Sequence, residues 1–266
     1  MLKNIIGFRN IYFLSNKNNN FYNNNKVCFS SKIYTKTGDK GTSALFNGER
    51  RSKCNPIFNV LGSVDELSSH LGVAKEQLVC LKTEIQSVDK DRTNTIHKVI
   101  EEIESIQCLL LDVGSNVATP ATTSSEQHLM RAKFSDDHTT QLENWIDEHT
   151  LHLQPLKNFI LPGGGLSASQ LQVCRSVCRR SERELVLMRE QLGEDSVNPS
   201  VMHFLNRLSD YLFTVARLST HIQKVEESVY KRITTPNENN NNNNSNNINT
   251  DKFQRHLEKH PTKEIK

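Results

Sequence analysis

Two segments in the C-terminal half of the chain carry mostly apolar side chains at strictly alternating intervals of three and four residues. In the first segment these positions are Leu171, Cys174, Cys178, Ser181, Leu185 and Met188. In the second segment they are Val201, Phe204, Leu208, Tyr211, Val215 and Leu218. Side chains with this spacing lie along one face of an α-helix, which is buried when it packs against a similar face. The pattern therefore predicts two long helices of a helical bundle.

Earlier segments repeat this periodicity and predict further helices. The apolar positions of two of them are Val60, Val64, Leu67 and Leu71, and then Ile96, Ile100, Ile103, Ile106 and Leu110. Another helix is expected around Trp145, and the stretches near residues 84–92 and 119–134 are expected to be loops. Asn55-Pro56 and Asn198-Pro199 suit the N-cap and first position of a helix. Because no segment alternates with period two, we expect an all-α bundle of about five helices.

The two ends of the chain differ in composition from the rest. Residues 1–31 contain four basic residues and no acidic one, which is typical of a mitochondrial transit peptide. The alternative is a disordered, asparagine-rich leader whose basic bias is accidental. Residues 233–266 include an asparagine tract that cannot bury enough apolar surface to fold, so we expect a disordered tail. The remaining residues, 32–232, are enough for one domain with a sizeable core.

Charge and cysteine content narrow the class of protein. The net charge is only +3, too small to favour a nucleic-acid partner, and the apolar runs are too short to cross a membrane. The six cysteines form no CxxC motif, and the close pair Cys174/Cys178 lacks further metal ligands nearby. We therefore predict no metal site and expect buried free thiols in a reducing compartment, such as the mitochondrial matrix.

Three arginines in the first of the two long helices form a row. Arg175, Arg179 and Arg183 are each four residues apart, so their like charges repel one another along one line of the helix. The row borders the buried stripe and indicates an anion-binding site. The alternative is a solvated face, or salt bridges to acidic residues of the bundle such as Glu182 and Asp210.

Two glycine-containing loops and a polar residue extend this anion hypothesis. The run KIYTKTGDKGTSALFNGERRSK (32–53) combines glycine turns with several basic residues, yet it lacks the spacing of a P-loop or a dinucleotide fingerprint. ILPGGG (160–165) leads into the arginine helix, whose N-terminus can attract an anion, although a hinge is the alternative. Asn206 is interpreted equally well as a ligand contact or an inter-helix hydrogen bond. Without a GxSxG or HExxH motif, an enzyme here would rely on positioning and electrostatics.

Seven stretches together resemble the ATP:cob(I)alamin adenosyltransferase family, of the mitochondrial type. In chain order they are IYTKTGDKGTS, GERRSK, GSVDELSSHLG, DVGSNVATP, FILPGGG, CRSVCRRSERELV and FLNRLSDYLFTVAR. They follow the family's order and span nearly all of residues 32–218.

The resemblance implies a five-helix bundle that assembles as a homotrimer with ATP between subunits. Such an enzyme binds Mg²⁺ with ATP, transfers the 5′-deoxyadenosyl group to cob(I)alamin and releases triphosphate. Methylmalonyl-CoA mutase and a cob(II)alamin reductase are the implied protein partners. The alternative is a non-catalytic chaperone that binds ATP or cobalamin and delivers the cofactor to a mutase.

The resemblance also assigns site residues. The implied ATP contacts are Thr35, Lys36, Thr37, Gly38, Ser43, Ala44, Lys53, Arg179, Arg180, Ser181, Glu182, Arg183 and Asn206. Arg179 is expected to be catalytic as well. Asp65 and Arg175 resemble a pair that links subunits beside the active site, and Phe159 resembles the aromatic residue that covers the lower face of the corrin. Gly164 departs from the pattern, because relatives can carry serine there.

Overall fold

The computed structural model describes residue 34 and residues 36–233. The predicted transit peptide, the asparagine tract and the proposed ATP contact Thr35 lie outside the described residues. The targeting role, the disordered tail and the ATP contact of Thr35 therefore stay predictions.

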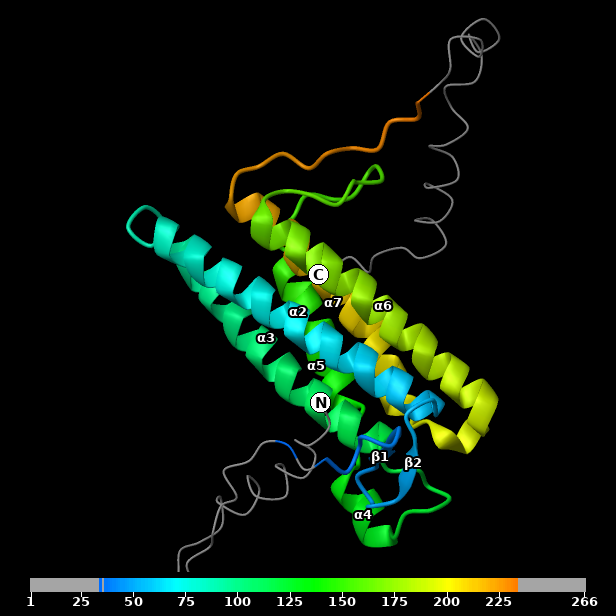
Figure 1. Ribbon diagram of the computed structural model, residues 1–266. Helices are drawn as coiled ribbons and strands as arrows, with labels where there is room; N and C mark the ends of the chain where they lie inside the picture. The colour runs from blue at the N-terminus through cyan, green and yellow to red at the C-terminus, as the bar shows by residue number, and fades with distance from the viewer. Residues whose placement is uncertain (1–33, 35, 234–266) are drawn as a thin grey trace, which may run out of the picture.

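Five long helices form the bundle that the apolar periodicity predicted (Figure 1). They are α2 (Pro56–Ile85), α3 (Lys90–Val117), α5 (Asp137–Thr150), α6 (Leu166–Leu192) and α7 (Pro199–Ile222). Helix α2 packs against α3 and α6, while α7 packs against α6 and α5. All the apolar positions named from the sequence are buried, including both long stripes. Burial of each such aliphatic side chain contributes about 1.5–3 kcal/mol, which makes the stripes the main source of cohesion.

The predicted helix starts are also confirmed. The side chain of Asn55 accepts a hydrogen bond from the Ile57 amide at 3.1 Å, and that of Asn198 accepts one from the Ser200 amide at 2.9 Å. Proline follows each cap, where its missing amide hydrogen costs nothing.

Four smaller elements were not predicted, so the all-α, five-helix description is incomplete. Strands β1 (Thr42–Ala44) and β2 (Arg50–Ser52) form an antiparallel pair in which Ser43 lies opposite Arg51. Helix α4 (Glu126–Arg131) lies within the segment that was expected to be a loop, and a 3₁₀ turn, η1 (Glu194–Ser196), precedes α7. These elements are too short to show a hydrophobic period.

A buried polar contact joins α3, α5 and α7. Glu102 Oε2 accepts a hydrogen bond from the Tyr211 hydroxyl at 2.7 Å and lies 2.7 Å from His149 Nε2. All three side chains are at most 3% exposed. Burial, followed by the nearby Glu102 carboxylate, raises the pKa of Tyr211 well above its usual value.

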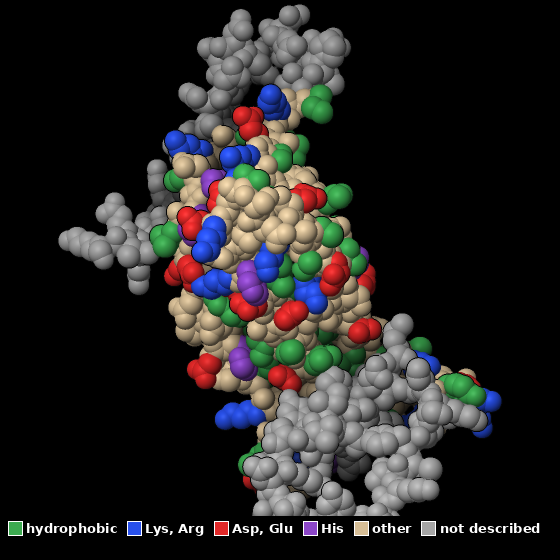
Figure 2. Space-filling model, turned by 90° about the vertical axis from the view of Figure 1, so that its left-hand side faces the viewer, with side chains coloured by type: hydrophobic (Ala, Val, Ile, Leu, Met, Phe, Trp, Pro, Cys, Tyr) green, Lys and Arg blue, Asp and Glu red, His purple; other side chains and the backbone are tan. Residues whose placement is uncertain are grey.

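The two ends of the bundle carry different segments (Figure 1). β1, β2 and α4 lie at one end, whereas the loop before α6 and the chain after α7 lie together at the other. No helix among the described residues is long and apolar enough to cross a membrane. On the face that Figure 2 shows, basic and acidic side chains are interspersed instead of forming a patch of one sign.

Cysteine burial was predicted only in part. Cys174 and Cys178 are buried, and burial raises the pKa of the Cys174 thiol to about 12. Cys54, Cys80 and Cys108 are free and exposed, so the expectation that the thiols are buried was wrong for these three. They lie outside the apolar stripes that direct side chains into the core.

Candidate active site

The arginine row on α6 lies on the surface of the bundle. Arg179 and Arg183 are exposed and Arg175 is half-buried. Within the described chain, Arg179 has no side-chain hydrogen bond or ion pair, and the Arg183 guanidinium donates only to the Arg179 carbonyl oxygen, at 3.0 Å. Residues four apart rise about 6 Å along a helix, so the two cations are close and uncompensated.

The acidic residues that could have neutralised the row are engaged elsewhere. Glu182 accepts a hydrogen bond from the Asn206 amide at 2.8 Å, and Asp210 pairs with Arg207 at 2.8 Å. The alternative of internal salt bridges to Glu182 and Asp210 is therefore wrong for Arg179 and Arg183. The row presents positive charge that an anion could neutralise.

Two neighbours in the same segment have structural contacts instead. Arg180 forms an ion pair with Glu66 on α2, and its guanidinium holds the pKa of the Glu66 carboxyl below the usual value. Ser181 is fully buried, and its hydroxyl donates to the Val177 carbonyl oxygen at 3.1 Å. The fold thus turns the Ser181 side chain into the core, away from the surface that Arg179 and Arg183 share.

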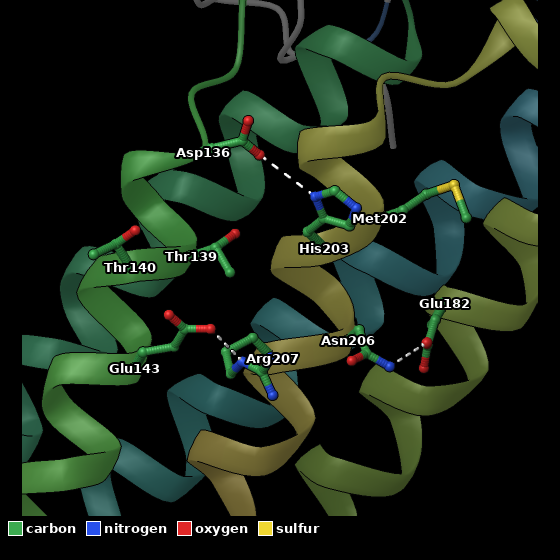
Figure 3. A pocket seen from close by; sticks show the side chains of 9 residues that line it. All are labelled: Asp136, Thr139, Thr140, Glu143, Glu182, Met202, His203, Asn206 and Arg207. Carbon is green, nitrogen blue, oxygen red and sulfur yellow. Dashed lines mark hydrogen bonds and ion pairs between the residues drawn. The ribbon is translucent and has the colours of Figure 1, made fainter.

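Glu182 and Asn206 form one wall of a cavity of about 490 Å³ between α5, α6 and α7 (Figure 3). Asp136 and Glu143 on the α5 side pair with His203 and Arg207 on α7, at 3.5 and 3.0 Å. Asp136, Glu143 and His203 were missed from the sequence. The only signal was that His203 lies three residues before Asn206, about one helical turn, and that Arg207 directly follows Asn206.

The N-terminal loop brings several of its predicted contacts together. Lys53 Nζ lies 3.4 Å from the position that a Cβ on Gly38 would occupy. The Arg50 guanidinium donates to the Thr37 carbonyl oxygen and, at 2.8 Å, to the Thr42 hydroxyl, which ties the start of the loop to the sheet. Lys36 adopts a left-handed backbone conformation, with φ of 58°, and its side chain is exposed. Ser43 and Ala44 lie in β1.

The loop and the arginine row are separated within one chain. The loop ends at Lys53, next to the start of α2, whereas the Arg180–Glu66 ion pair lies ten residues into α2. Ten helical residues correspond to about 15 Å. In one copy, neither Arg179 nor Arg183 has a hydrogen bond or ion pair with the described residues 36–53.

Asp65 and Arg175 do not pair with each other among the described residues of one chain. Asp65 is exposed on α2, and Arg175 Nε donates to Gln172 Oε1 at 2.8 Å. Their role as a link between subunits remains a prediction. Phe159 lies in the loop before α6 with its side chain 62% exposed.

The glycine triplet differs from position to position in the space that it leaves for a side chain. Gly164 has a φ of +97°, and a Cβ there would lie 2.0 Å from Thr220 Oγ1, so a serine cannot fit without a shift of α7 or the loop. Gly163 faces open space. Which residue relatives carry at position 164 stays a prediction.

No group of three or more His, Cys, Asp and Glu side chains in the described part of the chain could hold a metal ion.

Comparisons with known proteins agree with the resemblance. A family model described as cobalamin adenosyltransferase matches residues 33–219. The corrinoid adenosyltransferase MMAB of Mus musculus is 47% identical over 201 residues, covering 76% of this chain and 78% of the relative. The Homo sapiens protein of the same name is 46% identical over 201 residues, covering 76% and 74%.

Solved structures of such enzymes have the same fold. A variant PduO-type ATP:corrinoid adenosyltransferase from Lactobacillus reuteri, complexed with cobalamin and ATP, aligns with a TM-score of 0.63 at 36% identity. The alignment covers 76% of this chain and all of that chain. Because the family model spans residues 33–219, well over half of the sequence, the chain belongs to the cobalamin adenosyltransferase family.

Proposed function

We propose that the protein transfers the 5′-deoxyadenosyl group of ATP to cob(I)alamin and releases triphosphate. The observation that carries this proposal is the pair of uncompensated guanidinium groups, Arg179 and Arg183, on a fold shared with enzymes complexed with cobalamin and ATP. The reduced cobalt supplies the electron pair that forms the new bond to C5′. The C5′–oxygen bond breaks, and triphosphate leaves with that bond's electrons.

The residues present suit this chemistry because the nucleophile needs no protein base. What the protein must provide is alignment of the two substrates and stabilisation of the negative charge that develops on the leaving triphosphate. Arg179 and Arg183 would supply that stabilisation, and Lys36 and Lys53 would add positive charge from the N-terminal loop. Arg180 would act indirectly, because its ion pair with Glu66 fixes α6 against α2.

We infer that Mg²⁺ is carried by ATP. Mg²⁺ in nucleotide sites is usually held by substrate phosphates together with one or two protein oxygens. Glu182 and Asn206, whose side chains meet at 2.8 Å beside the row, are the oxygen-bearing groups that fit this role. When bound, the ion would add positive charge to the triphosphate.

We propose a homotrimer with ATP between subunits, as the resemblance implies. In one copy, neither Arg179 nor Arg183 has a hydrogen bond or ion pair with the described loop of residues 36–53, which supports a site completed by a second copy. In the assembly, the loop of one subunit would close over the row of its neighbour. Asp65 and Arg175 would then pair across the same interface.

Location, domain limits and partners are part of the same proposal. Residues 1–31 would direct the protein to the mitochondrial matrix, residues 32–232 would form the catalytic domain, and residues 233–266 would be a tail. A cob(II)alamin reductase would supply the reduced substrate, and methylmalonyl-CoA mutase would take the product. The similarity to MMAB proteins supports the mitochondrial assignment.

An anaerobic assay tests the reaction. Chemically reduced cobalamin is mixed with ATP, Mg²⁺ and the full-length protein, and the absorbance of the corrinoid is followed while the products are separated by anion-exchange chromatography. We expect adenosylcobalamin and triphosphate in equal amounts. Formation of ADP, or binding of both ligands without any conversion, would contradict the proposal, and the second result would favour the chaperone alternative.

A further inference from the structure

The loop that carries Phe159 is paired with the chain that follows α7. The Leu161 amide donates to the Ser228 carbonyl oxygen at 2.7 Å, and the Tyr230 amide donates to the Phe159 carbonyl oxygen at 2.8 Å. Ile160 and Val229 form an antiparallel bridge between these bonds. Figure 1 shows the two segments side by side beyond the N-terminus of α6. We call residues 225–230 the C-terminal strap.

Arg217 of α7 holds both segments. This arginine is only 8% exposed, and its Nε and Nη2 atoms donate to the two carboxylate oxygens of Glu227 in the strap, at 2.6 and 3.2 Å. Nη2 also donates to the Gln154 carbonyl oxygen at 2.9 Å, five residues before Phe159. A planar guanidinium that binds a carboxylate through two nitrogens fixes direction as well as distance. One buried side chain therefore connects α7, the strap and the loop.

The other end of the loop is fixed to the same helix end. Gln223 Nε2 donates to the Gly164 carbonyl oxygen at 3.2 Å, and Gly164 lies too close to Thr220 for any side chain. The backbone around Phe159 is thus held on both sides, although the Phe159 ring is 62% exposed. Surface loops are usually more mobile than the helices they connect. The hydrogen bonds that hold this loop therefore indicate that the position of the exposed Phe159 ring matters.

We propose that Arg217, acting through Glu227, is a positioning residue that fixes Phe159 where the ring covers the lower face of the corrin. This inference rests on the proposed function, because it needs cobalamin to bind against Phe159. In this role Arg217 would act through Glu227 and not by contact with a substrate. Loosening the strap should therefore impair use of the corrinoid while leaving the ATP site, which lies further along α6, unaffected.

Glu227→Gln tests the inference, and Glu226→Gln is its matched control. The two residues are adjacent in the strap, but among the described residues the Glu226 side chain has no hydrogen bond or ion pair. In Glu227→Gln we expect the KM for cob(I)alamin to rise about tenfold, the fold-change that corresponds to loss of one charge-assisted contact, while the KM for ATP stays within about twofold. Glu226→Gln should match the wild type in both constants.

Two readouts do not depend on turnover. Amide hydrogen exchange should become faster at Leu161 and Tyr230 in Glu227→Gln. The Phe159 ring would occupy the lower face of the corrin, where the dimethylbenzimidazole of free cobalamin binds cobalt. In the variant, cob(II)alamin bound with ATP should therefore keep its dimethylbenzimidazole on cobalt in a larger share of molecules. Arg217→Lys, which keeps the charge but loses the paired geometry, should behave like Glu227→Gln.

Failure of the proposed function and failure of the positioning role give different results. If the wild type forms no adenosylcobalamin, the proposed function fails, and the exchange measurement still decides whether Glu227 holds the loop. If the wild type is active and Glu227→Gln matches Glu226→Gln in exchange and in KM for cob(I)alamin, the positioning role is wrong. An equal rise in both KM values with a lower melting temperature would also overturn it, because that result indicates general destabilisation.

Discussion

At the scale of single residues, neighbouring arginines of α6 differ in what surrounds them. Arg180 is neutralised by Glu66, whereas Arg179 has no side-chain partner in the described chain. An unpaired cation at the surface contributes little to folding, so Arg179 is free to bind a ligand without loss of stability. This contrast separates the contacts that hold the helix in place from those that are available to a triphosphate.

Arg179→Ala should therefore abolish activity without unfolding the protein. We expect kcat to fall by about 10²–10³-fold, as when one preorganised donor to a developing negative charge is removed. The free energy of unfolding should change by no more than about 0.5 kcal/mol, since no contact is lost. Steady-state kinetics and denaturant titration measure the two quantities.

Arg189→Ala is the control for the loss of one positive charge from α6. Arg189 lies six residues beyond Arg183 and pairs with the exposed Glu194 at 3.1 Å. We expect its kcat to match the wild type. Full activity in Arg179→Ala would show that the row does not bind the leaving group.

Adjacent glycines before α6 should tolerate serine to different degrees. Gly164→Ser must either move Thr220 or change a backbone φ of +97°, so we expect it to lower the free energy of unfolding by about 1–3 kcal/mol. Gly163→Ser meets open space and should cost less than about 0.5 kcal/mol. Thermal melting of the two variants gives the comparison, and equal melting temperatures would refute the steric argument.

Prediction of single residues from the sequence succeeded where the helical period decides which side chains are buried. It failed where the contact depends on how two helices pack against each other. The spacing of Cys174, Cys178 and Ser181 predicted their burial. The same spacing puts Ser181 out of reach of a surface ligand, although the resemblance assigned the whole run 179–183 to ATP. Successive helix residues point about 100° apart, so a continuous motif cannot face one ligand throughout. The Arg180–Glu66 pair requires knowing how α2 packs.

At the scale of elements, the long helices could be predicted and the small ones could not. A strand of three residues shows no alternation, and β1 and β2 depend on contacts with distant parts of the chain. The Asn47 amide donates to the Ser124 hydroxyl at 3.0 Å, and the Thr123 hydroxyl donates to Glu49 at 2.6 Å. Such side-chain contacts between residues more than seventy positions apart leave no periodic signal in the sequence.

The contact between α3, α5 and α7 depends on Tyr211. Tyr211→Phe keeps the ring but removes the hydroxyl that donates to the buried Glu102 carboxylate, so a buried acceptor loses a donor. We expect the free energy of unfolding to fall by about 1–3 kcal/mol, measured by urea denaturation. Tyr230→Phe, on the exposed strap, is the control and should change it little.

This stabilisation should also depend on pH in a defined direction. The folded-state pKa of Tyr211 is raised above its usual value of 10.0, so the native protein keeps the phenol proton at a pH where the unfolded chain loses it. The advantage of the wild type over Tyr211→Phe is therefore fully present below pH 10 and declines as the pH rises above it. A difference that stays constant or grows above pH 10 would contradict the assignment.

At the scale of the whole molecule, the two parts of the ATP site argue for assembly. One copy holds the N-terminal loop beside the start of α2 and the Arg180–Glu66 pair about 15 Å along that helix. The sequence suggested both parts but not how far apart they lie, because that distance depends on how α2 and α6 pack against each other. In the proposed trimer, a second copy would place its own loop over the row.

Mixing two inactive variants tests this arrangement. Lys53→Ala damages the loop and Arg179→Ala damages the row, so each homotrimer should be inactive. In co-expressed trimers, a site regains both intact parts when an Arg179→Ala subunit provides the loop and a Lys53→Ala subunit provides the row. Random assembly at equal expression gives this pairing at about a quarter of the sites.

We therefore expect the co-expressed mixture to recover up to about a quarter of wild-type activity, with light scattering confirming trimers of unchanged mass. If loop and row belonged to a site within one chain, every chain in the mixture would still lack one of them, and no activity would return. Recovery of activity thus requires an intersubunit site. Its absence from well-formed mixed trimers would instead require the loop to move along α2 and close over the row of its own chain.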